Sequence, residues 1–193
     1  MSCAAIILAA GESRRMGSPK ALLPFRGGTF LSVVADTLGT HCSPVVGVFG
    51  AQAARLMAQA PASLIPAANP LWEQGMLTSL QAGLRAMAEL PERVLFTLVD
   101  HPSIAADTVR LLLQSSAVIA IPRFAGKRGH PVVIHRAIAQ EILDEPVTSK
   151  LNTVIDRHAA AIHYVDVDDA GIRDDIDDPA LYKDLLAREV ARV

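Results

Sequence analysis

Positive charge and glycine gather in one short loop near the start of the chain. Residues 11–20 read GESRRMGSPK, which places Arg14, Arg15 and Lys20 beside two glycines. Glycine lets backbone amides approach a ligand closely, and cations neutralise phosphate oxygens, so this composition is typical of an anion-binding loop. It is not a Walker A loop, because Ser-Pro-Lys follows the second glycine, and it does not match GxGxxG either. A solvated loop whose arginines point into water is the alternative.

The first acidic candidate is Asp100, which follows an apolar run. Residues 95–99 read LFTLV and lead directly into Asp100-His101-Pro102. An aspartate at the end of a buried strand is well placed to bind Mg2+, which takes one or two carboxylates and fills its other positions with water and phosphate. An ordinary turn or helix-capping aspartate is the alternative interpretation.

A second acidic set lies near the end of the chain, where seven aspartates occur between positions 166 and 178. Asp178 precedes Pro179 and is expected to be a helix N-cap with proline at the first helical position. Four others are expected to face solvent, namely Asp166, Asp168, Asp169 and Asp174. Asp175 and Asp177 flank the apolar Ile176, so they should lie on opposite sides of an extended segment, with one of them pointing into a cleft.

Two further segments combine glycine with polar side chains. Residues 69–80 read NPLWEQGMLTSL, and a helix starting there would offer free backbone amides to an anion or a polar base. A plain loop and cap, with Trp72 in the core, is the alternative, and for Trp72 we prefer it. Residues 126–131 read GKRGHP and precede a strand, so their glycines fit a hairpin turn as well as a binding loop.

The elements that must position these residues alternate between strand and helix. The apolar runs are mostly continuous, which is typical of strands covered on both faces, and the fold class is therefore predicted to be α/β with a mostly parallel sheet. The strands are expected at Ala4–Ala10, Val45–Phe49, Val94–Val99, Ala117–Ile121, Val132–Ile134 and Ile162–Val167. The helices are expected at Phe30–Leu38, Ala51–Gln59, Met76–Leu90, Ala105–Leu113, Thr148–His158 and Pro179–Val193. Ligands of such folds bind beyond the carboxyl ends of the strands.

Length and composition limit the possible functions. The 193 residues suit one domain over 1–193, and a net charge of −2 indicates no general attraction to nucleic acid or to membranes. The two cysteines, Cys3 and Cys42, form no disulfide framework and no zinc motif. The start of the chain does not read as a signal peptide, and no apolar stretch approaches membrane-spanning length. We therefore expect a cytoplasmic protein.

The first loop closely resembles a long family signature. LAAGESRRMGSPK is similar to the LAAGxSxRMGxxK motif of MobA/MocA-type nucleotidyltransferases, which attach a nucleotide to molybdopterin, and the resemblance extends from Ile6 to about Pro179. It implies a Rossmann-like nucleotide-diphospho-sugar transferase fold. It also implies catalytic roles for Arg15, Lys20 and Asp100. The nucleotide-binding residues it implies are Leu8, Ala9, Ala10, Gly11, Arg15, Lys20, Asn69, Gly75 and Ser79.

The same resemblance implies the rest of the site and the reaction. Mg2+ would be held by Asp100 and, of the later pair, by Asp175 rather than Asp177, while Arg128 and His130 would bind the acceptor. The expected reaction is transfer of a nucleotide from a nucleoside triphosphate to the phosphate of molybdopterin, with release of pyrophosphate. A molybdenum hydroxylase is a conceivable client, and neither nucleic acid nor membrane is an expected partner.

The choice of nucleotide depends on Ala10. Guanylyl-transferring relatives typically read LAGG in this motif and cytidylyl-transferring ones AAG, so Ala10 favours CTP. The alternatives are GTP, another phosphorylated acceptor, or a non-catalytic accessory protein that binds molybdopterin. A dinucleotide-binding oxidoreductase is disfavoured because GxGxxG is absent.

Overall fold

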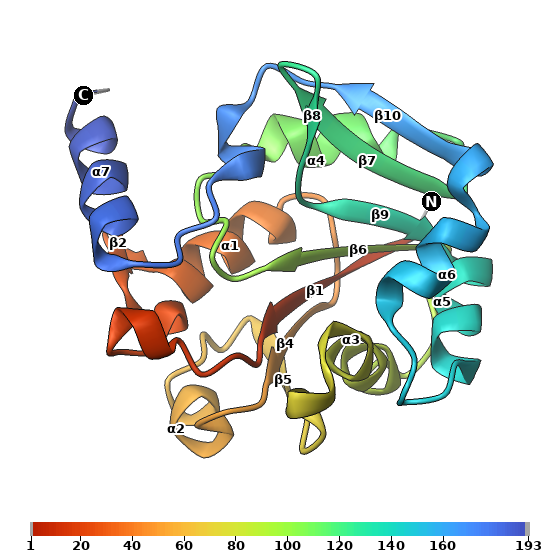
Figure 1. Cartoon of the computed structure of the whole chain (residues 1–193), viewed down its shortest axis with the longest axis horizontal. Coiled ribbons are helices and arrows are strands. Elements are labelled where there is room, and N and C mark those ends of the chain that lie inside the picture. Colours follow the sequence, from red (N-terminus) through yellow and green to blue (C-terminus); the bar gives the residue numbers. More distant parts are fainter. Residues whose placement is uncertain (1, 192–193) are drawn as a thin grey trace.

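A twisted sheet runs through the centre of the computed structural model, which describes residues 2–191 (Figure 1). The strand order is β10-β7-β9-β6-β1-β4-β5, and β8 pairs with β7. The strands are β1 (Cys3–Ala9), β4 (Val45–Phe49), β5 (Leu64–Ala68), β6 (Arg93–Leu98), β7 (Ile119–Phe124), β8 (Lys127–Arg128), β9 (Val132–His135) and β10 (Ile162–Asp166). A separate two-stranded hairpin consists of β2 (Pro24–Phe25) and β3 (Gly28–Thr29).

The sheet is mostly parallel, which confirms the predicted fold class. β1 pairs in parallel with both β4 and β6, β4 pairs in parallel with β5, and β7 pairs in parallel with β10. β9 is antiparallel to its neighbours β6 and β7, and β8 is antiparallel to β7. The central strands are uninterrupted runs of apolar residues because helices cover both of their faces.

Helices form a layer on each side of the sheet. They are α1 (Phe30–Gly39), α2 (Ala53–Ala58), α3 (Met76–Arg85), α4 (Ala106–Leu113), α5 (Arg136–Asp144), α6 (Leu151–Arg157) and α7 (Pro179–Val190). Figure 1 shows α3, α5 and α6 together on one side of the sheet, and α1 and α4 on the other. No helix in residues 2–191 is long and apolar enough to cross a membrane.

Strand β1 illustrates how the two layers are held to the sheet. Its alternate residues Ala5, Ile7 and Ala9 belong to the apolar cluster formed with α1 and α4. The intervening Ala4, Ile6 and Leu8 belong to the cluster formed with α3, α5 and α6. Because successive side chains of a strand point to opposite faces, one continuous apolar run contributes to both cores.

Several predicted boundaries were wrong, and two elements were not predicted. β5 was not predicted, because Leu64–Ala68 contains Pro66 and has exposed positions, as an edge strand allows. α5 was not predicted either, because its sequence is half polar. α2 begins at Ala53 instead of Ala51, since Gln52 adopts a left-handed conformation with φ of 58°. α3 ends at Arg85 instead of Leu90, and the last positions predicted for α7 lie outside the described residues.

The order of the strands places a crevice beside β1. The chain passes from β1 outward through β4 to β5, and then returns to the other side of β1 as β6. The connections that leave the carboxyl ends of β1 and β6 therefore diverge, and a reversal of this kind is where open α/β sheets bind their ligands. The loop at residues 11–20 and Asp100 both start at this crevice.

The close contact between α3 and β1 leads to a stability prediction at Gly83. A Cβ added to Gly83 would lie 2.7 Å from Ile6 Cγ2 and 3.0 Å from Val48 Cγ2, both in the buried core. We expect Gly83→Ala to lower the free energy of unfolding by about 1–2 kcal/mol, since overpacking outweighs the better helix propensity of alanine.

The matched control is Gly39→Ala at the end of α1, where the nearest atom to an added Cβ is Val45 Cγ2 at 4.0 Å. Urea denaturation of both variants measures the effect. A Gly83→Ala protein as stable as the Gly39→Ala protein would contradict the prediction.

Candidate active site

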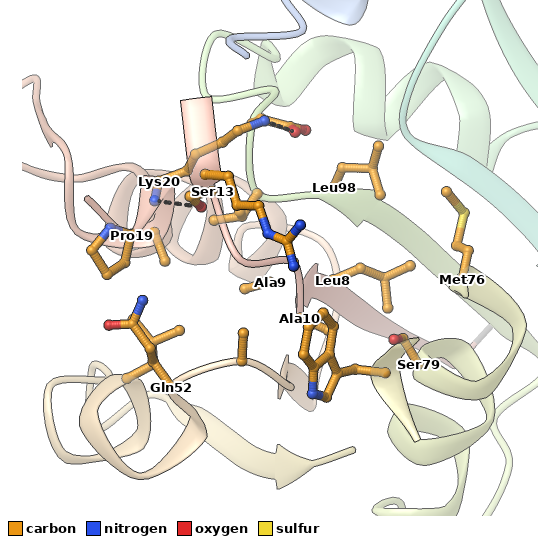
Figure 2. A pocket seen from close by; sticks show the side chains of 18 of the residues that line it. Leu8, Ala9, Ala10, Ser13, Pro19, Lys20, Gln52, Met76, Ser79 and Leu98 are labelled. Carbon is orange, nitrogen blue, oxygen red and sulfur yellow. Dashed lines mark hydrogen bonds and ion pairs between the residues drawn. The ribbon is translucent and has the colours of Figure 1, made fainter. Parts of the chain in front are cut away.

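The crevice beside β1 contains a cavity of about 370 Å3. Its walls come from the end of β1, the loop at residues 11–20, the start of α2, the start of α3 and the end of β6. Figure 2 shows Lys20, Ser13 and Pro19 on one side of it, Met76 and Ser79 on the other, and Leu8 and Ala10 between them. The predicted site residues in its lining are Leu8, Ala9, Ala10, Gly11, Arg15, Lys20, Gly75, Ser79 and Asp100.

The first loop folds so that its cationic end turns back toward the cavity. Ser13 and Gly17 adopt left-handed conformations with φ of 55° and 67°, and they bracket a single turn of 3-10 helix at Arg14–Met16. The backbone amide of Lys20 donates a hydrogen bond to Ser13 Oγ at 3.1 Å. This closed loop places the side chain of Lys20 in the crevice beside β6.

Lys20 is the centre of a charge network. Its Nζ donates to Asp100 Oδ2 at 2.7 Å and also to Asp177, which in turn accepts from Arg15. Burial alone would lower the pKa of Lys20, but the hydrogen bonds that its ammonium group donates to Asp100 and Asp177 outweigh it and raise that pKa. The hydrogen bond from Lys20 likewise lowers the pKa of Asp177. Lys20 and Asp177 are therefore both charged at neutral pH, and phosphate oxygens would compete with Asp177 for Lys20 and Arg15.

A second group forms around the free side of Asp100. One potential ligand atom each from Asp100, His101 and Asp175 lies within 4.8 Å of the others. Among residues 2–191, Asp100 Oδ1 has no hydrogen-bond partner although it is buried. Desolvation and the neighbouring carboxylates of Asp100 and Asp177 raise the pKa of Asp175, whereas burial lowers the pKa of His101. Two carboxylates in one place, one of them with an unpartnered oxygen, fit a divalent cation.

A second cavity, of about 520 Å3, adjoins the first. Arg128 and His130, the predicted acceptor-binding residues, line it together with Asp175, and Met76 and Leu98 line both cavities. Its remaining walls are mostly apolar and include side chains of β6, β9 and α6, among them Phe96, Val132, Leu151 and Ile155. A cavity that combines apolar walls with arginine and other polar side chains suits an organic group that carries an anion.

The hairpin that carries Arg128 is fixed against the C-terminal segment. Ala125 and Gly126 have positive φ angles of 48° and 76° and connect β7 to β8, so the predicted hairpin turn is present. The amide of His130 donates to Ile172 O at 2.9 Å, and a Cβ on Gly129 would collide with the same carbonyl group. Burial, and secondly the nearby His101, lower the pKa of His130 to about 4, so its imidazole is neutral at pH 7.

The segment before α3 contributes differently from what its sequence indicated. Gly75 has φ of 110° at the N-cap of α3 and lines the first cavity, as does Ser79. Asn69 is buried outside that lining and donates to Thr78 Oγ1 and Ser79 Oγ at 3.1 and 3.0 Å, so it positions Ser79. Trp72 was expected in the core, but it is half-buried and lines the cavity.

The acidic C-terminal segment was only partly predicted. Asp178 is the N-cap of α7 and accepts from Ala180 N and Leu181 N, as expected. Asp169 does not face solvent, because it accepts from Ala105 N and Thr108 Oγ1 at the start of α4. Asp175 and Asp177 do lie on different sides of Ile176: Asp175 lines the second cavity and Asp177 the first.

Comparison with known proteins places this geometry in a family. The MobA-like NTP transferase domain matches residues 5–162. The chain belongs to that family. It is a nucleotidyltransferase of the MobA-like type, as its resemblance to the LAAGxSxRMGxxK signature had indicated. The matched region contains the cation-rich loop, Asp100 and the Arg128 hairpin, and it ends before Asp175 and Asp177.

Curated relatives of the chain carry three different names. The chain is 39% identical to "nicotine blue oxidoreductase" of Paenarthrobacter nicotinovorans over 144 residues, which are 67% of this chain and 69% of that protein. It is 30% identical to the molybdenum cofactor cytidylyltransferase of Escherichia coli strain K12 over 181 residues, 90% of each chain. It is 34% identical to a probable molybdenum cofactor guanylyltransferase of Mycobacterium ulcerans over 157 residues, 77% and 75% of the two chains.

Solved structures share the fold. Rv0371c of Mycobacterium tuberculosis H37Rv superposes with a TM-score of 0.83 at 23% identity, covering 97% of this chain and 98% of that one. A second structure of Rv0371c, in complex with manganese, has a TM-score of 0.76 at 21% identity and covers 97% and 99%. A CMP:2-keto-3-deoxy-manno-octonic acid synthetase complexed with CTP has a TM-score of 0.77 at 14% identity and covers all of both chains.

The position of Lys20 leads to a prediction about triphosphate binding. We expect Lys20→Ala to weaken nucleoside triphosphate binding about 10- to 100-fold, because a charge-assisted hydrogen bond to phosphate is worth about 1.5–3 kcal/mol. The control is Lys127→Ala on β8, which removes an exposed lysine outside the first cavity. Equilibrium titration with a fluorescent nucleotide measures the affinity, and equal affinities of the two variants would refute a phosphate-binding role for Lys20.

Proposed function

We propose that this chain transfers a cytidylyl group from CTP to the phosphate of molybdopterin, with release of pyrophosphate. The observation that carries the proposal is the contact between the two cavities. The phosphate-binding loop opens into one cavity and Arg128 and His130 into the other, while Met76 and Leu98 belong to both walls. Asp100 and Asp175 stand on opposite sides of this boundary, where a nucleotide and an acceptor would meet.

The reaction asks the chain for positioning and charge neutralisation. An oxygen of the acceptor phosphate attacks the α-phosphorus in line, the bond to the bridging oxygen breaks, and pyrophosphate leaves with that electron pair. An ionised phosphate needs no general base, so no nucleophilic side chain is required. Arg15 and Lys20 bind the departing pyrophosphate. The two cavities hold the nucleotide and the acceptor in line for the reaction, and this positioning supplies the remaining acceleration.

The donor set at the boundary fits Mg2+. The unpartnered Oδ1 of Asp100 and the carboxylate of Asp175 are hard oxygen ligands, of which Mg2+ takes one or two. When bound there, the ion would neutralise negative charge on phosphate oxygens. The roles of Arg128 and His130 toward the acceptor phosphate or its ring are part of the same proposal.

Preference for CTP rests on Ala10. This residue is buried at the end of β1 and lines the first cavity, where its methyl group narrows the space available to a base. The relatives include both a cytidylyltransferase and probable guanylyltransferases, so identity alone favours neither nucleotide.

A redox function is the second candidate, and one comparison favours it. The relative with 39% identity carries the name of an oxidoreductase acting on nicotine blue. The apolar second cavity would also accept a planar dye. The cation-rich loop that faces the first cavity nevertheless favours nucleotidyl transfer, because reduction of a dye requires no triphosphate site.

A panel of substrates tests these alternatives. The purified protein is mixed with each of ATP, GTP, CTP and UTP, with and without molybdopterin, and pyrophosphate release is measured in the presence of Mg2+. Release with CTP that depends on molybdopterin supports the proposal. Release with another triphosphate would correct the nucleotide, and binding of molybdopterin without release from any triphosphate would indicate an accessory protein. In a parallel assay, oxidation of NADH coupled to reduction of nicotine blue would support the redox function.

Asp100 provides a prediction about catalysis. We expect Asp100→Asn to lower turnover about 10²- to 10³-fold, comparable to removal of one preorganised electrostatic group in other enzymes, because the amide cannot supply a charged oxygen. The control is Asp107→Asn in the first turn of α4, where the carboxylate pairs with Arg110 at the surface. Turnover close to wild type for Asp100→Asn at saturating Mg2+ would exclude the proposed role.

Ala10 provides a prediction about base choice. Removing its methyl group in Ala10→Gly should raise kcat/KM for GTP relative to CTP, by an amount equivalent to about 1–3 kcal/mol at most. The strand end tolerates glycine, so little loss of stability is expected. Both nucleotides are compared in wild type and variant with the same acceptor. A wild type that already prefers GTP would overturn the cytidylyl assignment, and an unchanged ratio would remove Ala10 from base selection.

A further inference from the structure

Unpartnered polar atoms concentrate at one place in the protein. Among residues 2–191, six buried side-chain nitrogen or oxygen atoms have no hydrogen-bond partner, and four of them are Asp100 Oδ1, His101 Nδ1, Ser103 Oγ and His130 Nδ1. The rings of His101 and His130 are in contact, with centroids 4.9 Å apart. Buried polar groups are normally satisfied by protein, water or an ion, so this concentration points to a ligand at Asp100–Ser103.

The imidazole of His101 is buried beside Asp100, and the nitrogen near that carboxylate is Nε2, not the unpartnered Nδ1. Its side chain is 7% exposed, and its Nε2 lies 3.9 Å from the unpartnered Oδ1 of Asp100. This separation is too long for a hydrogen bond. It agrees with two ligands of one cation, because ligands bound at about 2.1 Å lie about 3–4 Å from each other. A carboxylate oxygen of Asp175 completes a set within 4.8 Å.

We propose that His101 supplies a nitrogen ligand to the divalent cation of this site, so that the chain offers two carboxylates and one imidazole. The inference rests on the proposed function only in that a divalent cation binds between Asp100 and Asp175. It gives the site a preference that an all-oxygen site lacks. Imidazole suits transition ions such as Fe2+, Ni2+ and Zn2+ better than Mg2+, which prefers hard oxygen ligands.

The test uses Mn2+ as the probe and detects the nitrogen directly. The full chain is loaded with less than one equivalent of Mn2+, with and without the non-hydrolysable α,β-methylene analogue of CTP. Electron spin-echo envelope modulation then reports whether a directly bound ¹⁴N is present. The wild type should show imidazole nitrogen modulation in at least one of these states, and His101→Gln, which offers an amide oxygen instead, should lose it.

Two further variants identify which histidine is involved. His130→Gln changes the ring packed against His101 and should keep the nitrogen signal. His41→Gln changes an exposed histidine on the connection between α1 and β4 and should also keep it. Calorimetric titration should show that His101→Gln weakens Mn2+ binding about tenfold or more. In metalloproteins, a loss of this size follows even from mutating a residue that only supports a metal ligand. The loss of Mg2+ affinity should be smaller.

Each remaining outcome rejects the inference. Absence of nitrogen modulation in the wild type in both states, including absence of any Mn2+ binding, overturns it. Persistence of the signal in His101→Gln assigns the nitrogen elsewhere and overturns it as well. A nitrogen signal that depends on His101, combined with no pyrophosphate release from any triphosphate, would keep this inference while rejecting the proposed function. The reverse pair of results would keep the proposed function alone.

Discussion

One ammonium group joins three segments that are far apart in the sequence. Lys20 Nζ contacts Asp100 at the end of β6 and Asp177 before α7, and its side chain is only 11% exposed. A cation this far removed from water is costly unless it is paired, so the three segments have to meet at the crevice. The convergence of these three segments shapes the wall of the first cavity and its boundary with the second. It also positions Asp100 so that one carboxylate oxygen stays unpartnered. A bound triphosphate would enter a site whose charges are already balanced by internal partners.

The core of the fold could be predicted because its signals are local. β1, β4 and β6 read as continuous apolar runs, and covering both faces of a parallel sheet requires such runs. β5 and α5 were missed because their burial depends on neighbours: β5 is exposed at several positions on the sheet edge, and α5 buries one face of a largely polar helix. Tertiary position decided these elements, and hydrophobic periodicity alone did not indicate it.

The site divides in the same way. The loop at residues 11–20 was recognisable because its glycines and cations are contiguous, and the structure places Arg15 and Lys20 in the cavity lining. The alternation around Ile176 correctly separated Asp175 from Asp177, but it gave no reason to expect a cavity on each side. Nothing in the sequence separately indicated that Trp72 and His101 lie near the site. A tryptophan or a histidine in a short motif fits a core position as well as a position in a cavity wall. Their proximity to the crevice follows only from the way α3 begins and β6 ends beside β1.

The position of Asp175 and Asp177 also affects where this domain can be said to end. The family match stops at residue 162, inside β10, yet both carboxylates follow that point. A protein truncated at the limit of the match would keep the cation-rich loop and Asp100 but would lose one of the two carboxylates paired with Lys20. It would also lose Ile172, whose carbonyl oxygen accepts a hydrogen bond from the backbone amide of His130. A search limited to the matched region would therefore overlook Asp175 and Asp177 of the proposed site, and we propose that the domain extends through α7.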